Sequence, residues 1–225
     1  MPEATNLSID ELTKVLSAPR LETYQLAYDQ LGFSDVTGLY AWNAKVSAAL
    51  ILPAHFAEIS IRNVADEVLT TVYGERWPWS LGFVQSLPHR QSQDLRRTRS
   101  NHTTTGKVIA ELKLVFWQQL FTQRHDNRLW LPYLASAMPH SPTRSPRLLR
   151  LEIRESIERI RKLRNRIAHH EPVFTRDLSE DLAVMLNLIS YRSEATGDWV
   201  KVWKRPAFSS QRYRFHQHLA ALSRA

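Results

Sequence analysis

The sequence has no cysteine among its 225 residues. That absence excludes disulfide frameworks, thiolate metal sites and a cysteine nucleophile. Disulfides belong to oxidising compartments, so the chain does not look built for secretion. Residues 1–12 contain acidic side chains and no apolar core, which is not the pattern of a secretory signal. We therefore expect a cytoplasmic protein.

Long hydrophobic runs are also lacking. No apolar run is longer than Ala48 to Leu52, which is far shorter than the roughly 20 apolar residues that a membrane span needs, so we expect no membrane partner. Glycine is scarce, with 6 residues, and the sequence shows neither repeats nor low-complexity tracts. The hydrophobic fraction of 43% is ordinary for a globular protein. A chain of this length can bury a full core, and we expect one domain over residues 1–225.

Acidic residues are in deficit. The chain has 22 Asp and Glu against 30 Lys and Arg, a formal net charge of +8, and its pI is about 10.0. A positive excess favours an anionic partner, and nucleic acid is the first candidate. Between Arg144 and Arg166 nine basic residues stand against three acidic ones, a local net charge of +6. Many basic proteins have no such partner, so charge alone does not decide the function.

Apolar residues recur at spacings of three and four nearly throughout, and no convincing alternation of period two is found, so the pattern predicts an all-α fold. Pro53 either kinks one long helix or opens a new one. Residues 75–88 are interpreted as a loop with aromatic anchors, and residues 75–105 as the most irregular part of the chain. The expected helices cover 8–17, 19–32, 35–73, 88–98, 108–121, 146–171, 177–191 and a C-terminal tail of about 198–225.

The most informative stretch is Arg161 to Pro172, where four basic side chains and two histidines crowd the end of one predicted helix. Cations there complement the negative end of the helix dipole, which is a purely structural explanation, but the dipole requires neither Asn165 nor the histidines. Guanidinium groups suit phosphate, and an imidazole can accept a proton near neutral pH. These groups could cleave RNA without a metal. A histidine would deprotonate the ribose 2′-OH while arginines hold the phosphate.

Helix geometry constrains this interpretation. Asn165 and His169 are four residues apart and share a helix face. Arg164 and His169 are five apart, which separates them by about 140° around an ideal helix. Either the helix loosens before Pro172, or a second copy of the chain completes the site. A twofold pairing of this helix would bring two Arg/His sets together.

The segment Arg164-Asn165-Arg166-Ile167-Ala168-His169 resembles the Arg-(four residues)-His motif, with Asn after the Arg, of the HEPN superfamily of ribonucleases. The longer string from Leu163 to Pro172 resembles the signature of the Abi-like proteins, an abortive-infection family of phage-resistance proteins. Further matching pieces follow in the family's order over roughly residues 20–200, namely Glu58–Asn63, Gly106–Leu112, Phe116-Trp117, Leu129-Trp130 and Pro132–Leu134.

The resemblance implies a HEPN-like helical bundle with additional helices, and a homodimeric, metal-independent endoribonuclease. It implies that Arg164 and His169 are the catalytic pair, with Asn165 in support. Such proteins typically act as toxins under the control of an antitoxin, which is RNA or protein. In those HEPN toxins that a nucleotidyltransferase antitoxin inactivates, a Tyr stands two positions after the motif His. This chain has Glu171 there, which argues against that type of antitoxin.

The remaining candidates support this pair. We expect Arg166 and His170 to help bind the phosphate. For His170 the alternatives are a second acid/base group and a structural cap next to Glu171. Glu58 and Arg62 are either a surface ion pair worth a few tenths of a kcal/mol or, with Asn63, a group that orients the motif helix.

A second basic cluster is interpreted as a solvated helix face or as a surface that guides RNA; it consists of Arg96, Arg97, Arg99 and His102. We expect RNA as substrate, no DNA partner, no cofactor and no metal ligands. The alternative function is a non-catalytic RNA-binding or regulatory HEPN module. A third class is an interaction protein whose basic helix contacts an acidic partner.

Overall fold

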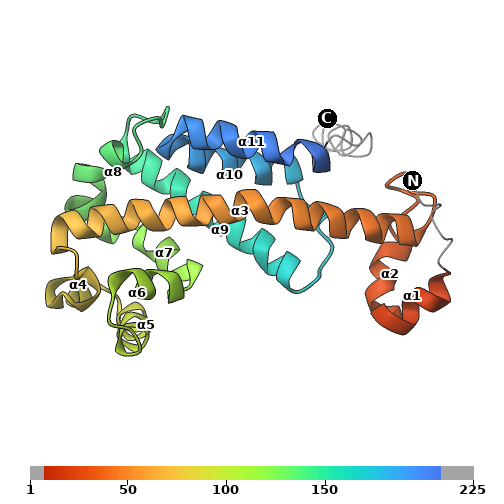
Figure 1. The fold of residues 1–225 in the computed structure, drawn as a ribbon, viewed down its shortest axis with the longest axis horizontal. Coiled ribbons are helices and arrows are strands. Elements are labelled where there is room, and N and C mark those ends of the chain that lie inside the picture. The colour runs from red at the N-terminus through yellow and green to blue at the C-terminus, as the bar shows by residue number, and fades with distance from the viewer. Residues whose placement is uncertain (1–7, 209–225) are drawn as a thin grey trace.

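A computed structural model of the chain describes residues 8–208 (Figure 1). The described part contains helices and no strand, so the predicted all-α class is confirmed. Its buried apolar side chains form one cluster that extends from Leu21 to Val200.

The central element is α3 (Val36–Tyr73), a helix of 38 residues that runs along the length of the structure in Figure 1. The Asp35 carboxylate caps its first turn by accepting a hydrogen bond from the Gly38 N–H at 2.7 Å. Its C-terminal cap is Gly74 with a φ of 82°, which glycine adopts without steric cost. Pro53 lies inside this one helix, so it does not open a new one.

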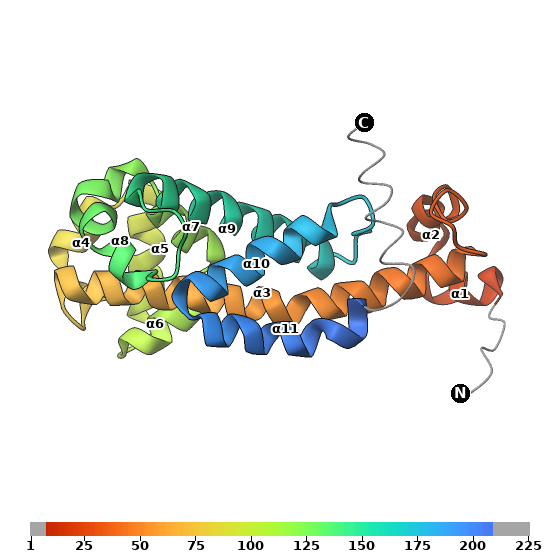
Figure 2. The same cartoon turned by 90° about the horizontal axis from the view of Figure 1, so that it is seen from above.

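Three long helices pack along α3, as Figures 1 and 2 show: α9 (Pro146–Ala168), α10 (Leu178–Arg192) and α11 (Glu194–Phe208). Pro146 stands at the start of α9, as predicted, because its fixed φ and missing N–H suit the first turn. The predicted C-terminal helix begins earlier than expected, at Glu194, and residues 209–225 of that prediction lie outside the described part of the chain.

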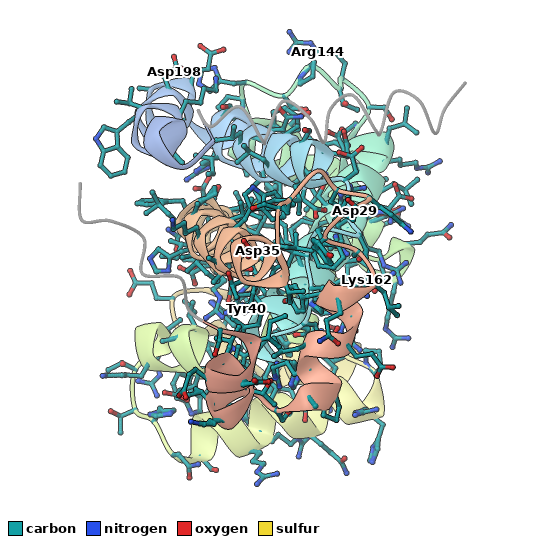
Figure 3. The ribbon with its side chains drawn as sticks, turned by 90° about the vertical axis from the view of Figure 1, so that its right-hand side faces the viewer. Asp29, Asp35, Tyr40, Arg144, Lys162 and Asp198 are labelled. Atoms are coloured by element: carbon teal, nitrogen blue, oxygen red, sulfur yellow. The ribbon has the colours of Figure 1, made fainter. Side chains whose placement is uncertain are left out.

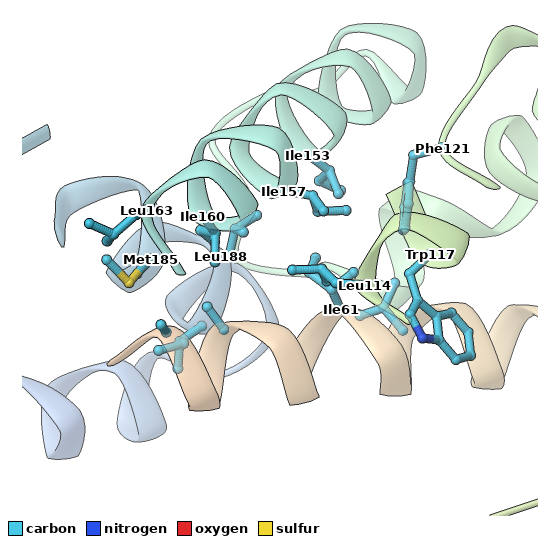
Figure 4. Close-up of a cluster of buried hydrophobic side chains, with 14 of the residues drawn as sticks. Ile61, Leu114, Trp117, Phe121, Ile153, Ile157, Ile160, Leu163, Met185 and Leu188 are labelled. Atoms are coloured by element: carbon cyan, nitrogen blue, oxygen red, sulfur yellow. The ribbon is translucent and has the colours of Figure 1, made fainter. Parts of the chain in front are cut away.

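The apolar stripe of α9 faces the core, as its spacing predicts (Figure 4). Figure 4 shows Ile153, Ile157, Ile160 and Leu163 of α9 near Ile61 of α3, and Met185 and Leu188 of α10 in the same cluster. Each of these seven side chains is at most 3% exposed. Burial of this stripe fixes which face of α9 remains available for chemistry.

The N-terminal helices α1 (Ile9–Leu16) and α2 (Ala18–Gln25) lie at one end of α3. The Ser8 hydroxyl accepts a hydrogen bond from the Glu11 N–H at 3.2 Å and so caps the first turn of α1, at the predicted start of this helix. The second helix was expected to continue to about Gly32 but ends at Gln25. Turns follow it, and the Phe33 N–H bonds to the Tyr28 carbonyl, which brings Phe33 into the core.

Residues 75–138 form a group of short helices at the other end of α3 (Figure 1). They are η1 (Trp77–Trp79), α4 (Leu81–Ser86), α5 (His89–Ser100), α6 (Thr105–Glu111), α7 (Leu114–Leu120), η2 (Gln123–His125), the π-helical η3 (Asp126–Trp130) and α8 (Leu131–Ala137).

The prediction that residues 75–105 are the most irregular part is therefore wrong. Trp77 is fully buried, its indole N–H donates to the Asp66 carboxylate at 2.7 Å, and its ring meets Phe83 edge to face. These contacts fold the expected loop into helical turns. The stripe from Val108 to Phe121 is in turn divided at Leu112 and Lys113, which have extended backbone angles.

By length and composition alone, α3 is apolar enough to cross a membrane, with a mean hydropathy of 1.3 over its most apolar 18-residue stretch. The sequence had indicated no such segment, because polar residues interrupt every apolar run. The core helix of a soluble protein has the same composition, and Leu50, Ala57, Val64 and Leu69 of α3 are all fully buried in the described core.

Candidate functional site

The motif lies at the end of α9, where Arg164, Asn165 and Arg166 occupy the last helical turns. The His169 N–H donates to the Asn165 carbonyl at 2.9 Å, so the helical hydrogen bonding continues to His169. The helix does not loosen between Arg164 and His169. The angular separation of about 140° expected for an ideal helix therefore applies within one chain.

The helix end is closed by a turn at His170, which has a φ of 57°. The His170 N–H bonds to the Ile167 carbonyl at 3.0 Å, and the Glu171 N–H bonds to the Arg166 carbonyl at 2.8 Å. A residue with positive φ at this position is a common helix terminator, usually glycine. Arg20 of α2 donates to the His170 carbonyl at 2.9 Å, which ties this turn to the N-terminal helices. The backbone of His170 thus performs the capping role that was the structural alternative.

Glu58 of α3 joins two arginines. One carboxylate oxygen accepts from Arg62 on the same helix, and the other accepts from Arg164 of α9. The Glu58 side chain is only 11% exposed, whereas that of Arg164 is 42% exposed. Arg62 also donates to the carbonyls of Ile109 and Ala110 at 2.8 and 3.0 Å. The structure therefore brings Glu58 and Arg62 to the motif arginine, beyond the local ion pair that was the alternative.

Two cavities flank this carboxylate bridge, and Glu58, Arg62, Ala110 and Arg164 line both. The first, of about 420 Å³, also includes Asn165 and residues 111–115 of the α6–α7 junction. The second, of about 440 Å³, includes Asn63 and an apolar wall composed of Ile51, Ile59 and Ile109. The Arg164 guanidinium is therefore accessible from two sides and is tied to Glu58 between them.

Arg166 is separate from this group. Its guanidinium donates to the Pro172 carbonyl at 2.8 Å and to the Thr175 hydroxyl at 2.9 Å, and its Nε lies 3.7 Å from the Glu171 carboxylate. These contacts tie the loop after α9 to its last turn. The phosphate contact expected for Arg166 would compete with them.

The His169 side chain is exposed and forms no hydrogen bond or ion pair within residues 8–208. Neither His169 nor His170 lines the cavities beside Arg164. One chain thus presents an arginine and a histidine on different sides of the same helix end, and the pair does not meet. Across the described residues no group of three or more His, Asp or Glu side chains could hold a metal ion.

The basic excess of α9 is mostly matched by carboxylates. Six of its eight cations are in ion pairs, namely Arg150–Asp126 at 2.7 Å, Arg159–Asp181 at 2.6 Å, Arg161–Glu158 at 2.9 Å, Lys162–Glu158 at 3.5 Å, Arg166–Glu171 at 3.7 Å and Arg164–Glu58. Four of the six use carboxylates from outside α9. The local charge of +6 counted along the sequence is therefore largely neutralised in space.

Sequence reasoning missed Lys113 and counted Arg161 only among the basic residues of the motif stretch, yet both line the first cavity together with Arg164. Arg161 lies three residues before Arg164 on α9, a spacing that could have indicated it. Lys113 lies at the cavity because α6 ends and α7 begins on either side of it, and the backbone between the two helices is extended. Compared with protein-family models, with curated proteins and with solved structures, the chain has no match.

Proposed function

We propose that this chain is a metal-independent endoribonuclease of the HEPN type, an Abi-like phage-defence toxin that acts as a homodimer in the cytoplasm. The observation that carries the proposal is the accessible arrangement at the end of α9. Arg164 and Asn165 line an open cavity, and His169 is exposed at the end of the same regular helix. Each group is available, and a second copy of the chain would supply the missing partner.

In the proposed reaction His169 removes the proton from a ribose 2′-OH. The 2′ oxygen then attacks the adjacent phosphorus, and the bond from phosphorus to the 5′ oxygen breaks. Arg164 stabilises the negative charge that develops on the phosphoryl oxygens, and Asn165 supports it. A second proton donor protonates the leaving 5′ oxygen. The products carry a 2′,3′-cyclic phosphate and a free 5′-hydroxyl.

Glu58 acts in this proposal as a positioning residue. It accepts from both Arg164 and Arg62, and the Ile109 and Ala110 carbonyls fix Arg62 in turn. A phosphate that binds Arg164 would have to share the guanidinium with this carboxylate. The same pairing favours the second candidate, a module that binds RNA without cleaving it.

One assay separates the candidates. Purified protein is incubated with total RNA and with tRNA, in parallel with Mg²⁺ and in EDTA, and the new ends are mapped. Cleavage that leaves 2′,3′-cyclic phosphates and is lost in His169→Ala supports the enzyme. Retention of RNA without new ends supports the binding module. Cleavage that stops in EDTA contradicts the metal-free mechanism, and neither cleavage nor retention favours a contact with an acidic protein.

Mixing two inactive variants tests the composite site. Arg164→Ala chains keep His169, and His169→Ala chains keep Arg164, so a mixed dimer contains one intact pair across its interface. With random pairing, about a quarter of all sites are restored. If the mixture stays as inactive as each variant, although mixed dimers are shown to form, the site lies within one chain. The RNA target and the antitoxin, whether RNA or protein, would be sought with the inactive His169→Ala protein as bait.

A further inference from the structure

A second group of cations, on the short helices beside α3, differs from those of α9. Between residues 75 and 124 the chain has eight basic and three acidic residues, a net charge of +5. The basic residues are Arg76, Arg90, Arg96, Arg97, Arg99, Lys107, Lys113 and Arg124. Within residues 8–208 none of these eight forms an ion pair.

These cations also repel one another. Arg96 and Arg97 are exposed neighbours on α5. The pKa of Arg99 is lowered, first by burial and then by the positive charge of Arg96. Arg99 donates to the Pro78 carbonyl at 2.6 Å, so its own contact is to a neutral group. Like charges that form no ion pairs destabilise the compact state, and a bound anion relieves that cost.

Two cavities with shared lining residues lie between this surface and the motif arginine. A cavity of about 310 Å³ between α5 and the α6–α7 junction is lined by Arg97, Thr98, Asn101 and His102. It shares Glu111, Leu112, Lys113 and Val115 with the cavity of about 420 Å³ that contains Arg164 and Asn165. The exposed Lys113 therefore stands between Arg97 at one end and Arg164 at the other.

We propose that a single strand of RNA lies along this path, from α5 across the α6–α7 junction to Arg164. The proposal rests on the proposed ribonuclease function and adds where its substrate docks. Each cavity has the size of a small-molecule pocket, which suits nucleotides taken one at a time rather than a duplex.

The lining residues suggest how the strand is oriented. Arg97 and Lys113 contact phosphates, because a guanidinium and an ammonium are the usual phosphate ligands. Thr98 and Asn101 offer hydrogen bonds to base edges or to 2′-hydroxyls. Asp94 and Glu111 also line the cavity of about 310 Å³, and their carboxylates favour a strand that keeps its phosphates on the Arg97 and Lys113 side.

The test measures binding, so that it does not depend on cleavage. A fluorescent 20-nucleotide RNA with 2′-O-methyl groups, which cannot undergo 2′-OH attack, is titrated at several NaCl concentrations. We expect Arg97→Gln/Lys113→Gln to lower the slope of log K against log salt by about 1.4, since each lost phosphate contact on a single strand removes about 0.7. The same relation predicts about tenfold weaker binding at 0.15 M salt.

The matched control is Arg144→Gln/Arg147→Gln, which also removes two exposed cations that form no ion pair within residues 8–208. Arg144 lies on the opposite side of the molecule from α5 and α6 (Figure 3). We expect the control to keep the wild-type slope and affinity. Equal losses in both double variants would overturn the path, because they would show a contribution of net charge alone.

Three further outcomes are distinguishable. If the double variant does not fold, as judged by circular dichroism, the single Arg97→Gln variant must lower the slope by about 0.7. If poly-glutamate of equal charge binds as tightly as the RNA and shows the same loss, an acidic peptide is the ligand and the RNA path is wrong. If the path variant alone weakens binding but the wild type cleaves no RNA, the docking surface stands and the ribonuclease proposal fails.

Discussion

The α9 segment and the α5–α7 region have similar net positive charge along the sequence. In the folded structure most cations of α9 are paired with carboxylates, whereas those of the α5–α7 region form no ion pairs among the described residues. α9 packs between α3, α7, α8 and α10, so carboxylates such as Glu58 and Asp181 reach its arginines. α5 lies at the periphery, where Asp94 and Glu111 pair with none of its cations (Figure 1). A count of charges along the sequence therefore does not distinguish the cations that are paired with carboxylates from those that are not. Two of the latter, Arg97 and Lys113, line a cavity that shares residues with the one containing Arg164.

The largest expected effect tests the neutralised region. The Asp181 side chain is 1% exposed. Its Oδ1 accepts a hydrogen bond from Arg159 at 2.6 Å, and both of its carboxylate oxygens accept hydrogen bonds from Arg176 at 2.7 Å. Asp181→Asn should destabilise the fold by about 3–5 kcal/mol in urea unfolding, because it leaves two guanidiniums without a counter-charge.

The matched control for this change is Asp198→Asn, which breaks an exposed pair with Lys201 and should cost at most about 1 kcal/mol. A loss of similar size in the two variants would mean that solvent replaces Asp181 without penalty, and that the two kinds of ion pair do not differ.

The next effect concerns the site itself. Glu58→Gln removes the charge shared by Arg62 and Arg164 and should destabilise the protein by about 1.5–3 kcal/mol. Glu67→Gln on the same helix breaks a more exposed pair with Arg192 and should cost about 0.2–1 kcal/mol. We expect only Glu58→Gln to lower the rate of RNA cleavage under single-turnover conditions. Equal rates in both variants would contradict a positioning role for Glu58.

The third effect, of about 2 kcal/mol, is a pH dependence of the unfolding free energy that arises from His125, which lies beside Arg124, one of the cations that form no ion pair within residues 8–208. Burial, with the charges of Arg124 and Arg128, lowers the pKa of His125 to about 4. Between about pH 6.5 and pH 4 the imidazole of His125 is protonated in the unfolded chain but not in the folded one. The free energy of unfolding therefore decreases as the pH is lowered through this range. From pH 7 to pH 5 this group should remove about 2 kcal/mol of the unfolding free energy.

The variant His125→Gln checks that assignment, because it has no proton to bind in this range. Urea unfolding at pH 7 and pH 5 should show a loss for the variant that is about 2 kcal/mol smaller than for the wild type. Identical losses in the two proteins would assign the acid sensitivity to other groups.

The smallest expected effect tests the unpaired region. Arg96→Gln removes a cation that repels its neighbours and has no ion-pair partner among residues 8–208. Its unfolding free energy should stay within about 0.5 kcal/mol of the wild type, with any change towards higher stability. A destabilisation above about 1 kcal/mol in thermal or urea unfolding would reveal a favourable contact for Arg96 and weaken the contrast with α9.

Local signals predicted much of the fold. Asp35 and Gly74 delimit α3, and Ser8 and Pro146 mark helix starts, because capping depends on residues within one turn. The turns around Trp77 escaped prediction, since they depend on its contacts with Asp66 and Phe83. Nothing in the sequence around Trp77 indicates that it will form these contacts, so the segment has the sequence pattern of an ordinary loop.

The sequence by itself determined the helical class, the buried stripe of α9 and the Arg/His motif at its end, because periodicity and capping are short-range properties. Only the tertiary structure decided that Glu58 meets Arg164 across 106 positions, that Arg166 is tied to its own loop and that the α5 cations have no ion-pair partner within residues 8–208. Ion pairing depends on distances of a few ångströms between distant segments, and those distances exist only once the helices have packed.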